Sequence, residues 1–247
     1  MLIVITKREK EKNFIKRFLN KSRISISKNT LMGGTFYVVE CSREKTPWEK
    51  ILTSVPENAS FLLADGIMPV GAIKTFKSTG RLAKALFVKG FSNMVKSLPS
   101  SVKITLVDVG GSYTHLAKEF LSHVAFLRVV TAQRELYEDV ALHVLRETGA
   151  SLMISGDIKS SFDSDIVFIP DGAPKVMFFP SSVDVYAPFA DNINAENIFC
   201  VSGMHLPQSF IDAVPAGINA YSFAHAMFEC GSMKNIDGIE LDIKRCI

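Results

Sequence analysis

The second half of the chain alternates short apolar runs with amphipathic stretches. Helical spacing of apolar positions predicts helices over 112–124 and 134–149, the second ending at Gly149. Apolar runs bounded by turn residues predict strands at 103–109, 126–131, 151–155, 164–170, 175–180 and 197–203. Strands that are apolar on both faces are typical of a parallel sheet covered by helices. The pattern predicts a doubly wound, mainly parallel, Rossmann-like sheet with helices on both faces.

The first half has the same alternation on a smaller scale. A helix is predicted to begin at Thr46 and Pro47, and a longer one covers 81–97. A further helix over 9–20 places four apolar residues on one face: Phe14, Ile15, Phe18 and Leu19. Strands are predicted at 2–6, 35–41 and 59–65. The expected fold class is therefore α/β, with a small N-terminal α/β domain followed by the Rossmann-like sheet.

Charge divides the chain near residue 100. Residues 1–100 hold 18 Lys and Arg against 7 Asp and Glu, whereas residues 101–247 hold 10 against 18. The turn-rich stretch at 97–103 lies at the change, which predicts a basic domain over 1–100 and a nucleotide-binding domain over 101–247. The basic domain either faces an anionic ligand or the other domain, or it carries a solvated lysine-rich surface.

Composition narrows the class of protein. Among the 247 residues, 47% are hydrophobic and 21% charged, which is ordinary for a globular protein. No apolar run approaches the roughly 20 residues of a membrane span, and the N-terminal apolar run is too short for a signal peptide, so we expect a cytoplasmic protein without membrane association. The four scattered cysteines are interpreted as buried or incidental thiols, and the five histidines show no zinc-binding spacing, so no metal is expected.

The turn after the strand at 103–109 is the first candidate binding element. Gly110, Gly111 and Ser112 stand between this strand and the next helix, as in a dinucleotide-binding turn, where helix N–H groups face a pyrophosphate. Val109 and Thr114 occupy the places of the first and third glycines of that fingerprint, so the pattern is incomplete. The alternative is a tight strand-to-helix turn with no ligand.

Two loops after later strands add to the nucleotide hypothesis. Thr131 and Arg134 follow the second strand, where enzymes that use NADP offer a hydroxyl and an arginine to the 2′-phosphate. Arg134 is equally well placed to pair with Glu138. Asp171 and Gly172 follow the strand at 164–170, at the edge where ligands of such sheets lie, although Asp171 also suits a simple turn.

In outline the chain resembles the NADP-dependent oxidoreductases of the shikimate dehydrogenase and glutamyl-tRNA reductase type. The resemblance rests on the order of elements and on the stretches "LVDVGGS", "VVTAQRE" and "FDSDIVFIPDG". It implies a pyrophosphate near Gly110 and Gly111, a 2′-phosphate at Thr131 and Arg134, and a nicotinamide near four loop residues: Asp171, Gly172, Ser202 and Gly203. The chain departs from these enzymes in lacking an N-terminal Ser-x-Ser motif, a complete glycine fingerprint and a matching Lys–Asp pair.

Candidate catalytic residues come from loops on both halves. Asp65 ends a strand and Lys74 follows it in an irregular loop, so the two are candidates for an acid and a base facing a cleft. His205 follows the strand at 197–203 on the expected ligand side. Each of these residues also suits a solvated surface position.

Three functional hypotheses follow. The first is an NADP-dependent oxidoreductase of a small molecule, with its site between the domains. The second is a non-catalytic Rossmann-like protein that senses a nucleotide or metabolite, or an interaction scaffold. Nucleic-acid binding through the basic stretch 7–23 ranks third, because Phe14 and Phe18 fall on its apolar face and not among the charges. The apolar helix near 219–231 is expected in the core, with a homodimer face as the alternative.

Overall fold

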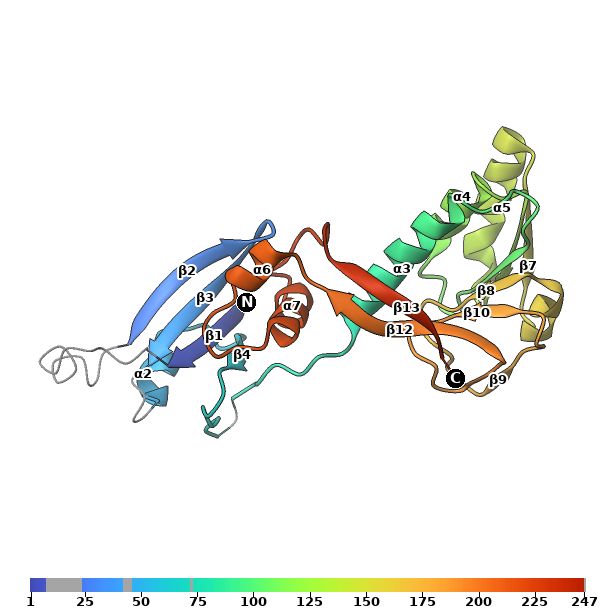
Figure 1. The fold of residues 1–247 in the computed structure, drawn as a ribbon. Coiled ribbons are helices and arrows are strands. Elements are labelled where there is room, and N and C mark those ends of the chain that lie inside the picture. Colours follow the sequence, from blue (N-terminus) through green and yellow to red (C-terminus); the bar gives the residue numbers. More distant parts are fainter. Residues whose placement is uncertain (8–23, 42–45, 72, 247) are drawn as a thin grey trace, which may run out of the picture. The chain divides into compact units, whose positions relative to one another are not determined.

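The computed structural model describes residues 1–7, 24–41, 46–71 and 73–246 (Figure 1). The chain forms two compact units, Met1–Leu82 with Leu206–Ile239, and Ala83–His205 with Glu240–Ile247. The chain thus returns to the first unit after residue 205, which a single boundary near residue 100 does not provide for. The helix expected over 9–20 and most of the basic stretch 7–23 lie outside the described residues.

The first unit is built on a four-stranded sheet in the order β2-β3-β1-β4. Its strands are β1 (Leu2–Lys7), β2 (Ser25–Leu31), β3 (Gly34–Cys41) and β4 (Ser60–Leu63). β1 lies parallel to both β3 and β4, as the alternation predicts, and β2 pairs antiparallel with β3. The hairpin turn between β2 and β3 uses positive φ at Met32 and Gly33, which suits the twist of paired strands.

Two layers cover the faces of this sheet. On one face Ile3, Ile5 and Val39 pack with Trp48 and Ile51 of helix α2 (Trp48–Thr53). On the other face Phe36 meets Phe223 of α7 (Ala220–Glu229), and Phe223 meets Phe210 of α6 (Gln208–Asp212). The side chain of Asn219 accepts a hydrogen bond from the Ser222 N–H and so caps the start of α7. The apolar stripe of α7 is therefore core.

A buried carboxylate fixes the start of helix α3 (Arg81–Val95) within the first unit. Glu229 accepts hydrogen bonds from the Thr79 N–H and hydroxyl and from the Ser78 hydroxyl. Burial acts to raise the pKa of Glu229, but the hydrogen bonds from Thr79 and Ser78 outweigh it and hold the pKa below its usual value. This carboxylate cap ties α7 to the segment that leads into α3.

The second unit is built on a seven-stranded sheet in the order β13-β12-β10-β8-β5-β6-β7. The strands are β5 (Ile104–Val107), β6 (Phe126–Val130), β7 (Ser151–Ser155), β8 (Ile166–Phe168), β10 (Asp184–Tyr186), β12 (Asn197–His205) and β13 (Glu240–Cys246). All pair in parallel except β13, which runs antiparallel to β12. Numbered along the chain from β5, the six parallel strands follow the order 3-2-1-4-5-6 of a Rossmann sheet. The predicted fold class is confirmed, including parallel pairing of β5 with β6.

One predicted strand belongs elsewhere. Within 175–180 only β9 (Met177–Phe178) forms, and it pairs with β11 (Ile193–Asn194) in a separate two-stranded sheet. The place next to β8 is taken by β10, whose buried residue is Val185. β9 is short because Phe178 points to solvent and Pro180 follows it.

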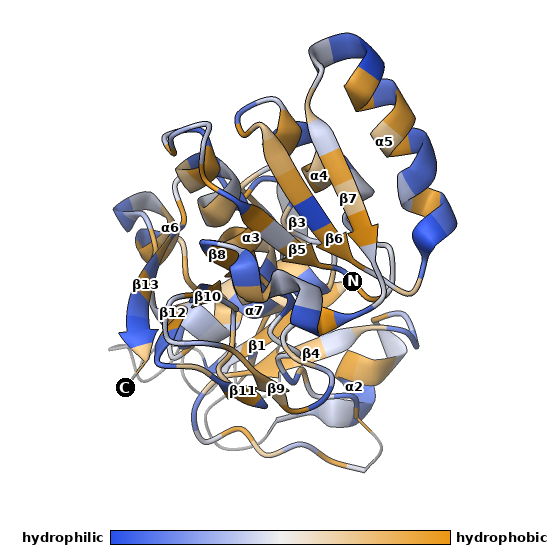
Figure 2. Cartoon of the chain, turned by 90° about the vertical axis from the view of Figure 1, so that its right-hand side faces the viewer, coloured by the Kyte–Doolittle hydropathy of each residue, from blue (hydrophilic) through white to orange (hydrophobic). Residues whose placement is uncertain are grey.

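Helices cover mainly one face of the large sheet. Helices α3, α4 (Thr114–Leu121) and α5 (Arg134–Thr148) pack with Leu106, Leu127 and Phe168 in one core cluster. In Figure 2 helix α5 carries both hydrophilic and hydrophobic colours along its length, as expected of a helix with one buried face. The opposite face is covered by the 3-10 helix η1 (Ile158–Asp163) and by the irregular segments around β9 and β11, instead of the long helices expected there.

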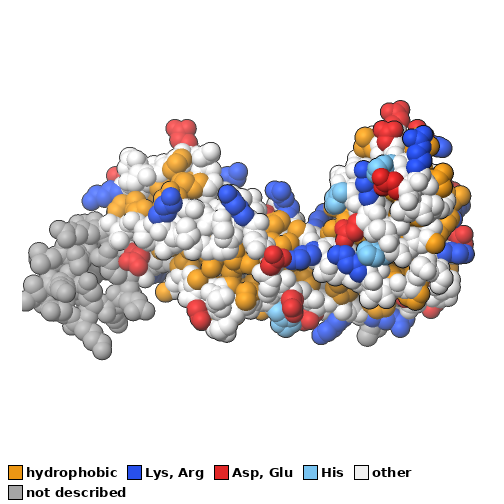
Figure 3. Space-filling view, turned by 90° about the horizontal axis from the view of Figure 1, so that it is seen from above, with side chains coloured by type: hydrophobic (Ala, Val, Ile, Leu, Met, Phe, Trp, Pro, Cys, Tyr) orange, Lys and Arg blue, Asp and Glu red, His pale blue; other side chains and the backbone are white. Residues whose placement is uncertain are grey.

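Charges of both signs share the surface of the second unit. Figure 3 shows acidic, basic and histidine side chains interspersed over its visible face. The acidic excess of residues 101–247 is therefore a difference in totals and does not make that face uniformly negative.

The last two strands are joined by a disulfide between Cys200 of β12 and Cys246 of β13, whose Cα atoms are 6.4 Å apart. The interpretation of these two cysteines as incidental thiols is wrong. The two cysteines are 46 residues apart in sequence, and a separation of that length does not indicate that they pair. Cys41 and Cys230 are not in a disulfide.

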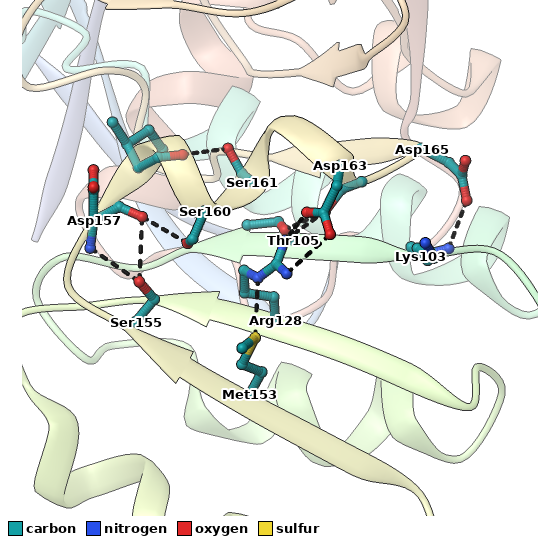
Figure 4. Close-up of polar contacts among 12 residues, drawn as sticks. Lys103, Thr105, Arg128, Met153, Ser155, Asp157, Ser160, Ser161, Asp163 and Asp165 are labelled. Carbon is teal, nitrogen blue, oxygen red and sulfur yellow. Dashed lines mark hydrogen bonds and ion pairs between the residues drawn. The ribbon is translucent and has the colours of Figure 1, made fainter.

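A buried arginine lies on the face covered by η1 (Figure 4). Arg128 of β6 pairs with the carboxylate of Asp163 at the end of η1, and its Nε donates to the Met153 sulfur at 3.4 Å. Close by, the hydroxyls of Thr105 and Ser164 hydrogen-bond at 2.7 Å. The Arg128 hydrogen bond holds the pKa of Asp163 below its usual value. The Arg128–Asp163 and Thr105–Ser164 pairs hold the crossover segment between β7 and β8 against the sheet.

Removing the Asp163 carboxylate should destabilise the second unit, because the Arg128 side chain is only 7% exposed and would keep a charge without its partner. We expect Asp163→Ala to lower the free energy of unfolding by about 2 kcal/mol, since Asp163 itself is solvated and the pair is partly screened. The contribution of Asp163 to the free energy of unfolding should be fully present above the pKa that aspartate has in the unfolded chain. It should be lost as the pH falls through the lower pKa that Asp163 has in the folded protein. Urea unfolding at pH 7 and pH 3 measures both, with the exposed Asp191→Ala as control. If Asp163→Ala were as stable as wild type, the Arg128–Asp163 pair would not hold the crossover between β7 and β8 in place.

Candidate functional site

The sheet of the second unit reverses its strand order between β5 and β8. β5 is followed along the chain by β6 on one side, and β8 lies on its other side. In open parallel sheets, ligands bind outside the carboxyl ends of the strands at this point. The residues that follow β5 and β8 are therefore the first place to look for a site.

Three polar side chains meet at that point. The Tyr113 hydroxyl, from the loop after β5, donates to Asp171 Oδ1, from the loop after β8, at 3.0 Å. The Lys84 ammonium of α3 donates to the Asp171 carbonyl oxygen at 3.1 Å and lies 3.6 Å from its carboxylate. Burial, followed by the nearby Asp171 carboxylate, raises the pKa of Tyr113 far above its usual value. The phenol therefore stays protonated, and Lys84 and Asp171 supply one charge of each sign.

Asp108 holds the loop after β5 in place. Its carboxylate accepts from the Ser112 N–H at 3.0 Å, from the Tyr113 N–H at 2.7 Å and from the Tyr137 hydroxyl of α5. Asp108 is 2% exposed. Burial and this hydrogen bond raise the pKa of Tyr137. The carboxylate thus joins the end of β5, the loop and α5.

The glycine turn at Gly110, Gly111 and Ser112 has a packing role that the structure makes plain. Gly111 has a φ of +72°, and a Cβ there would lie 2.6 Å from Leu136 Cδ1 and 3.0 Å from Gln133 Cβ. The Ser112 N–H, which would face a phosphate, already donates to Asp108. This loop does not fit a pyrophosphate held by the Ser112 and Tyr113 N–H groups. The phosphate role of the turn stays a prediction, and Gly111 has a structural reason to be glycine.

Thr131 and Arg134 lie after β6 as predicted. Thr131 is buried, and its hydroxyl accepts from the Gln133 N–H at 2.9 Å in a local turn before α5. Arg134 is exposed and its Nε donates to Glu138 at 2.9 Å, one turn along α5. This is the alternative pairing that the sequence left open, and in an exposed pair it leaves the guanidinium available to a ligand.

The other residues assigned to the cofactor lie on different elements, and the expectation that Ser202 and Gly203 are loop residues is wrong, because β12 continues to His205. Gly172, next to Asp171, has a φ of +79° and closes the loop after β8. Ser202 and Gly203 lie on β12 at an irregularity of its pairing with β13, where the Ser202 hydroxyl donates to the Asp242 carbonyl oxygen at 3.2 Å. His205 ends the same strand, with Nε2 2.9 Å from Asp242 Oδ2. The contacts of Ser202 and His205 are thus with β13 and not with the Tyr113–Asp171 pair.

Asp65 and Lys74 lie in the first unit and are both exposed. Their backbones are held, since the Asp65 N–H donates to Gly217 and the Lys74 carbonyl accepts from Phe61. No hydrogen bond or ion pair joins the two side chains in the part of the chain that the structure describes. Their acid and base roles stay predictions.

A serine, a histidine and a glutamate also come together in the first unit. The Ser78 hydroxyl lies 3.0 Å from His225 Nδ1 and donates to Glu229 at 3.2 Å. In a nucleophilic triad the serine and the acid face opposite ring nitrogens. Here both face Nδ1, with Glu229 3.9 Å away, and burial lowers the pKa of His225. The group therefore caps α3 and lacks triad geometry.

Sequence reasoning missed Lys84, Tyr113 and Asp108. Asp108 carries a signal in hindsight, because it follows an apolar strand directly and precedes two glycines. Tyr113 and Lys84 carry none, because their partner Asp171 lies 58 and 87 residues away in sequence. Within the described ranges, no three His, Cys, Asp or Glu side chains gather as a metal site requires.

Six parallel strands in Rossmann order, with polar side chains gathered where the order reverses, define an α/β protein with a Rossmann-like sheet. No family model and no curated protein matches the sequence. Among solved structures, one match is the Δ1-pyrroline-2-carboxylate reductase of Thermococcus litoralis in complex with NADH and L-proline. It is 9% identical, the match covers 70% of this chain and 60% of that one, and the TM-score is 0.32. This similarity is too low to support a conclusion on fold or function.

None of the helices in the described part of the chain is long and apolar enough to cross a membrane.

Proposed function

We propose that the second unit binds a nucleotide cofactor across the carboxyl ends of β5 and β8, and that the protein is an enzyme that uses it. The observation that carries the proposal is the meeting of Lys84, Tyr113 and Asp171 at the point where the strand order reverses. Sheets of this order bind nucleotides there. Lys84 and Asp171 at that edge can donate hydrogen bonds to, and accept them from, the ribose of a nucleotide and the polar reacting group of a substrate.

The first candidate activity is a pyridine-nucleotide-dependent oxidoreductase acting on a small molecule. When bound, a reduced nicotinamide supplies a hydride, and the protein must supply a proton to the reduced substrate. The Lys84 ammonium is the proton donor at this edge, and Asp171 orients it. Tyr113, protonated and hydrogen-bonded to Asp171, positions that carboxylate.

NADP is the proposed nucleotide, with Arg134 and Thr131 near its 2′-phosphate. We expect NADPH to bind about tenfold or more tightly than NADH, and Arg134→Ala to remove most of that preference, because it deletes one charge-assisted contact to phosphate. Isothermal titration of wild type, Arg134→Ala and Arg146→Ala measures this; Arg146 is an exposed arginine on the same helix and is the matched control. Equal affinity for both nucleotides, unchanged in Arg134→Ala, would remove the role of Arg134.

A specific observation favours a second candidate, a methyltransferase that uses S-adenosylmethionine. The Asp108 carboxylate takes the loop N–H groups on which a pyrophosphate would depend, and Asp171 at the same edge is paired with Tyr113 and Lys84. A nucleoside cofactor that has no phosphate does not need those N–H groups. The same titration with S-adenosylmethionine decides between the two.

The outcomes separate the alternatives. Binding of NADPH or NADH that is weakened by Asp171→Asn supports the oxidoreductase, and binding of S-adenosylmethionine alone supports methyl transfer. Binding of none of the three would overturn the cofactor proposal and favour the non-catalytic sensor or scaffold. We also propose a site between the units, a cytoplasmic location and a homodimer, and we rank nucleic-acid binding below them.

A further inference from the structure

The large sheet of the second unit ends in a strand whose outer edge is open. β7 is last in the strand order, and in the part of the chain that the structure describes it pairs with β6 alone. The Ser151 N–H and the Ser155 carbonyl oxygen are both hydrogen-bonded on the β6 side. Because successive residues of a strand turn their backbone groups to opposite sides, the N–H and C=O groups of Leu152 and Ile154 point to the open edge.

The open edge lacks the features that usually keep an edge strand from pairing, which are lysine, proline or a bulge. β7 has the sequence Ser-Leu-Met-Ile-Ser, and its register with β6 is regular. Met153 is 48% exposed, although its sulfur accepts a hydrogen bond from Arg128. The strand at the other edge of the sheet, β13, has four charged residues among its seven. β7 is therefore the edge that suits pairing with another strand.

Helix α5 lies beside β7 (Figure 2) and adds exposed leucines on the same side. Leu136 faces the loop after β5, because a Cβ at Gly111 would meet its side chain. Leu145 is nine residues further on, which is about two and a half helical turns, so it lies on the side of α5 away from β5. Leu142 shares that side, and the two are 54% and 57% exposed. Since the strand order is β5-β6-β7, Leu142 and Leu145 face the open edge.

The sequence of β7 is self-complementary about Met153. An antiparallel second copy centred there pairs Ser151 with Ser155 and Leu152 with Ile154, so each side chain meets one of its own kind. The same register makes Leu152 and Ile154 the hydrogen-bonded pairs, because their backbone groups are the ones that point outward. The two Met153 side chains then meet at the closely spaced position on the axis. A two-fold interface requires a surface that fits itself in this way.

The same axis places two copies of α5 at packing distance. α5 shares one core cluster with residues of β6 and β7, so across a β7–β7 pair the two helices are two strand spacings apart, about 10 Å. Packed helices are about 8–10 Å apart. Met153 lies about 7 Å along β7 from Ser151. The same length of α5, measured back from Thr148, ends between Leu142 and Leu145. Leu142 of one copy therefore faces Leu145 of the other.

We propose that the protein forms a two-fold homodimer in which β7 pairs antiparallel with β7 of a second copy and the two α5 helices pack through Leu142 and Leu145. The two seven-stranded sheets become one continuous sheet. The contact uses the open β7 edge of both copies, so assembly closes at two. The inference gives the proposed homodimer a surface and does not depend on cofactor binding, because the loops after β5 and β8 are not part of it.

Sedimentation velocity of the full chain over about 1–100 µM tests the dimer. We expect a monomer–dimer equilibrium with a micromolar Kd, because one short strand pair and one helix pair make a small interface. Leu145→Lys should weaken association about tenfold or more, since symmetry places two charges against apolar partners. Leu136→Lys is the matched control, because Leu136 is a similarly exposed leucine on the opposite side of α5, and it should leave the Kd unchanged. Melting curves show whether each variant is folded.

Amide hydrogen exchange tests the strand pairing itself. The N–H groups of Leu152 and Ile154 should exchange about threefold or more slowly at the highest concentration than at the lowest, because only the dimer gives them acceptors. In Leu145→Lys this concentration dependence should be lost. A monomer throughout the range, assemblies that grow beyond two copies, a wild-type Kd in Leu145→Lys, or a dimer in which Leu152 and Ile154 exchange as fast as in the monomer would each overturn the proposal.

Discussion

Gly34→Ala should cost the first unit about 4 kcal/mol or more of its free energy of unfolding, the largest effect expected of a single methyl group in this protein. A Cβ at Gly34 would lie 1.5 Å from the Ser232 carbonyl oxygen and 2.9 Å from the Met233 N–H nitrogen. The obstacle is backbone, and Ser232 and Met233 are both buried, so the strand and the segment after α7 must separate. Because domains are stable by about 5–15 kcal/mol, a loss of this size removes between about a quarter and most of that stability, so the first unit should unfold at a much lower urea concentration.

Urea unfolding and limited proteolysis test this directly. Gly156→Ala is the control, because nothing lies within 4 Å of a Cβ there and its φ is not positive. The control should change stability by less than about 0.5 kcal/mol. Early cleavage within the first unit of Gly34→Ala, with the second unit still protected, is the expected pattern. A Gly34→Ala chain that unfolds at the wild-type urea concentration would show that β3 does not depend on this close approach.

The elements that could be predicted from the sequence are those whose residues are mostly buried and therefore apolar. β5 is buried along its whole length and β6 from Leu127 onward, so their apolar residues are visible without any knowledge of partners. β2 escaped prediction because it is an edge strand with polar residues on both faces, and only its pairing with β3 makes it a strand. β10 escaped because a run of three residues is too short to stand out as a strand, and its place is defined by pairing with β8 and β12.

The candidate site was predictable only in part for the same reason. Asp171 was found because it follows a strand that the pattern located, and the rule that ligands lie at carboxyl ends then applies. Lys84 and Tyr113 join it through contacts between distant parts of the chain. The role of Gly111 depends on the sign of its φ and on its distance to Leu136, neither of which is encoded in a local pattern.

Asp108→Ala should be the most damaging substitution in the second unit. It leaves the Ser112 and Tyr113 N–H groups and the buried Tyr137 hydroxyl without their acceptor, and unsatisfied buried donors cost about 1–3 kcal/mol each. Since the three donors act together, we expect Asp108→Ala to lower the free energy of unfolding by about 4 kcal/mol. We expect Tyr137→Phe to lower it by about 1–2 kcal/mol, because this variant removes one donor and leaves the Asp108 carboxylate with the other two. Cofactor binding at the adjacent Tyr113 should be lost along with it.

The pH dependence gives this prediction a readout that a general packing defect would not reproduce. Burial and the Asp108 hydrogen bond raise the folded pKa of Tyr137 above its unfolded value of about 10. The phenol therefore contributes stability that is fully present below pH 10 and is lost as pH rises above it. Wild type should lose stability between pH 9 and pH 11, and Tyr137→Phe should lose less over this range, as followed by urea unfolding at each pH. Tyr113→Phe is the companion variant, because the pKa of Tyr113 is raised as well and part of the alkaline loss belongs to it. If the stabilities of Tyr137→Phe and wild type fall in parallel above pH 9, the Tyr137 phenol does not contribute to stability through Asp108. Other contacts would then connect β5 and its loop to α5.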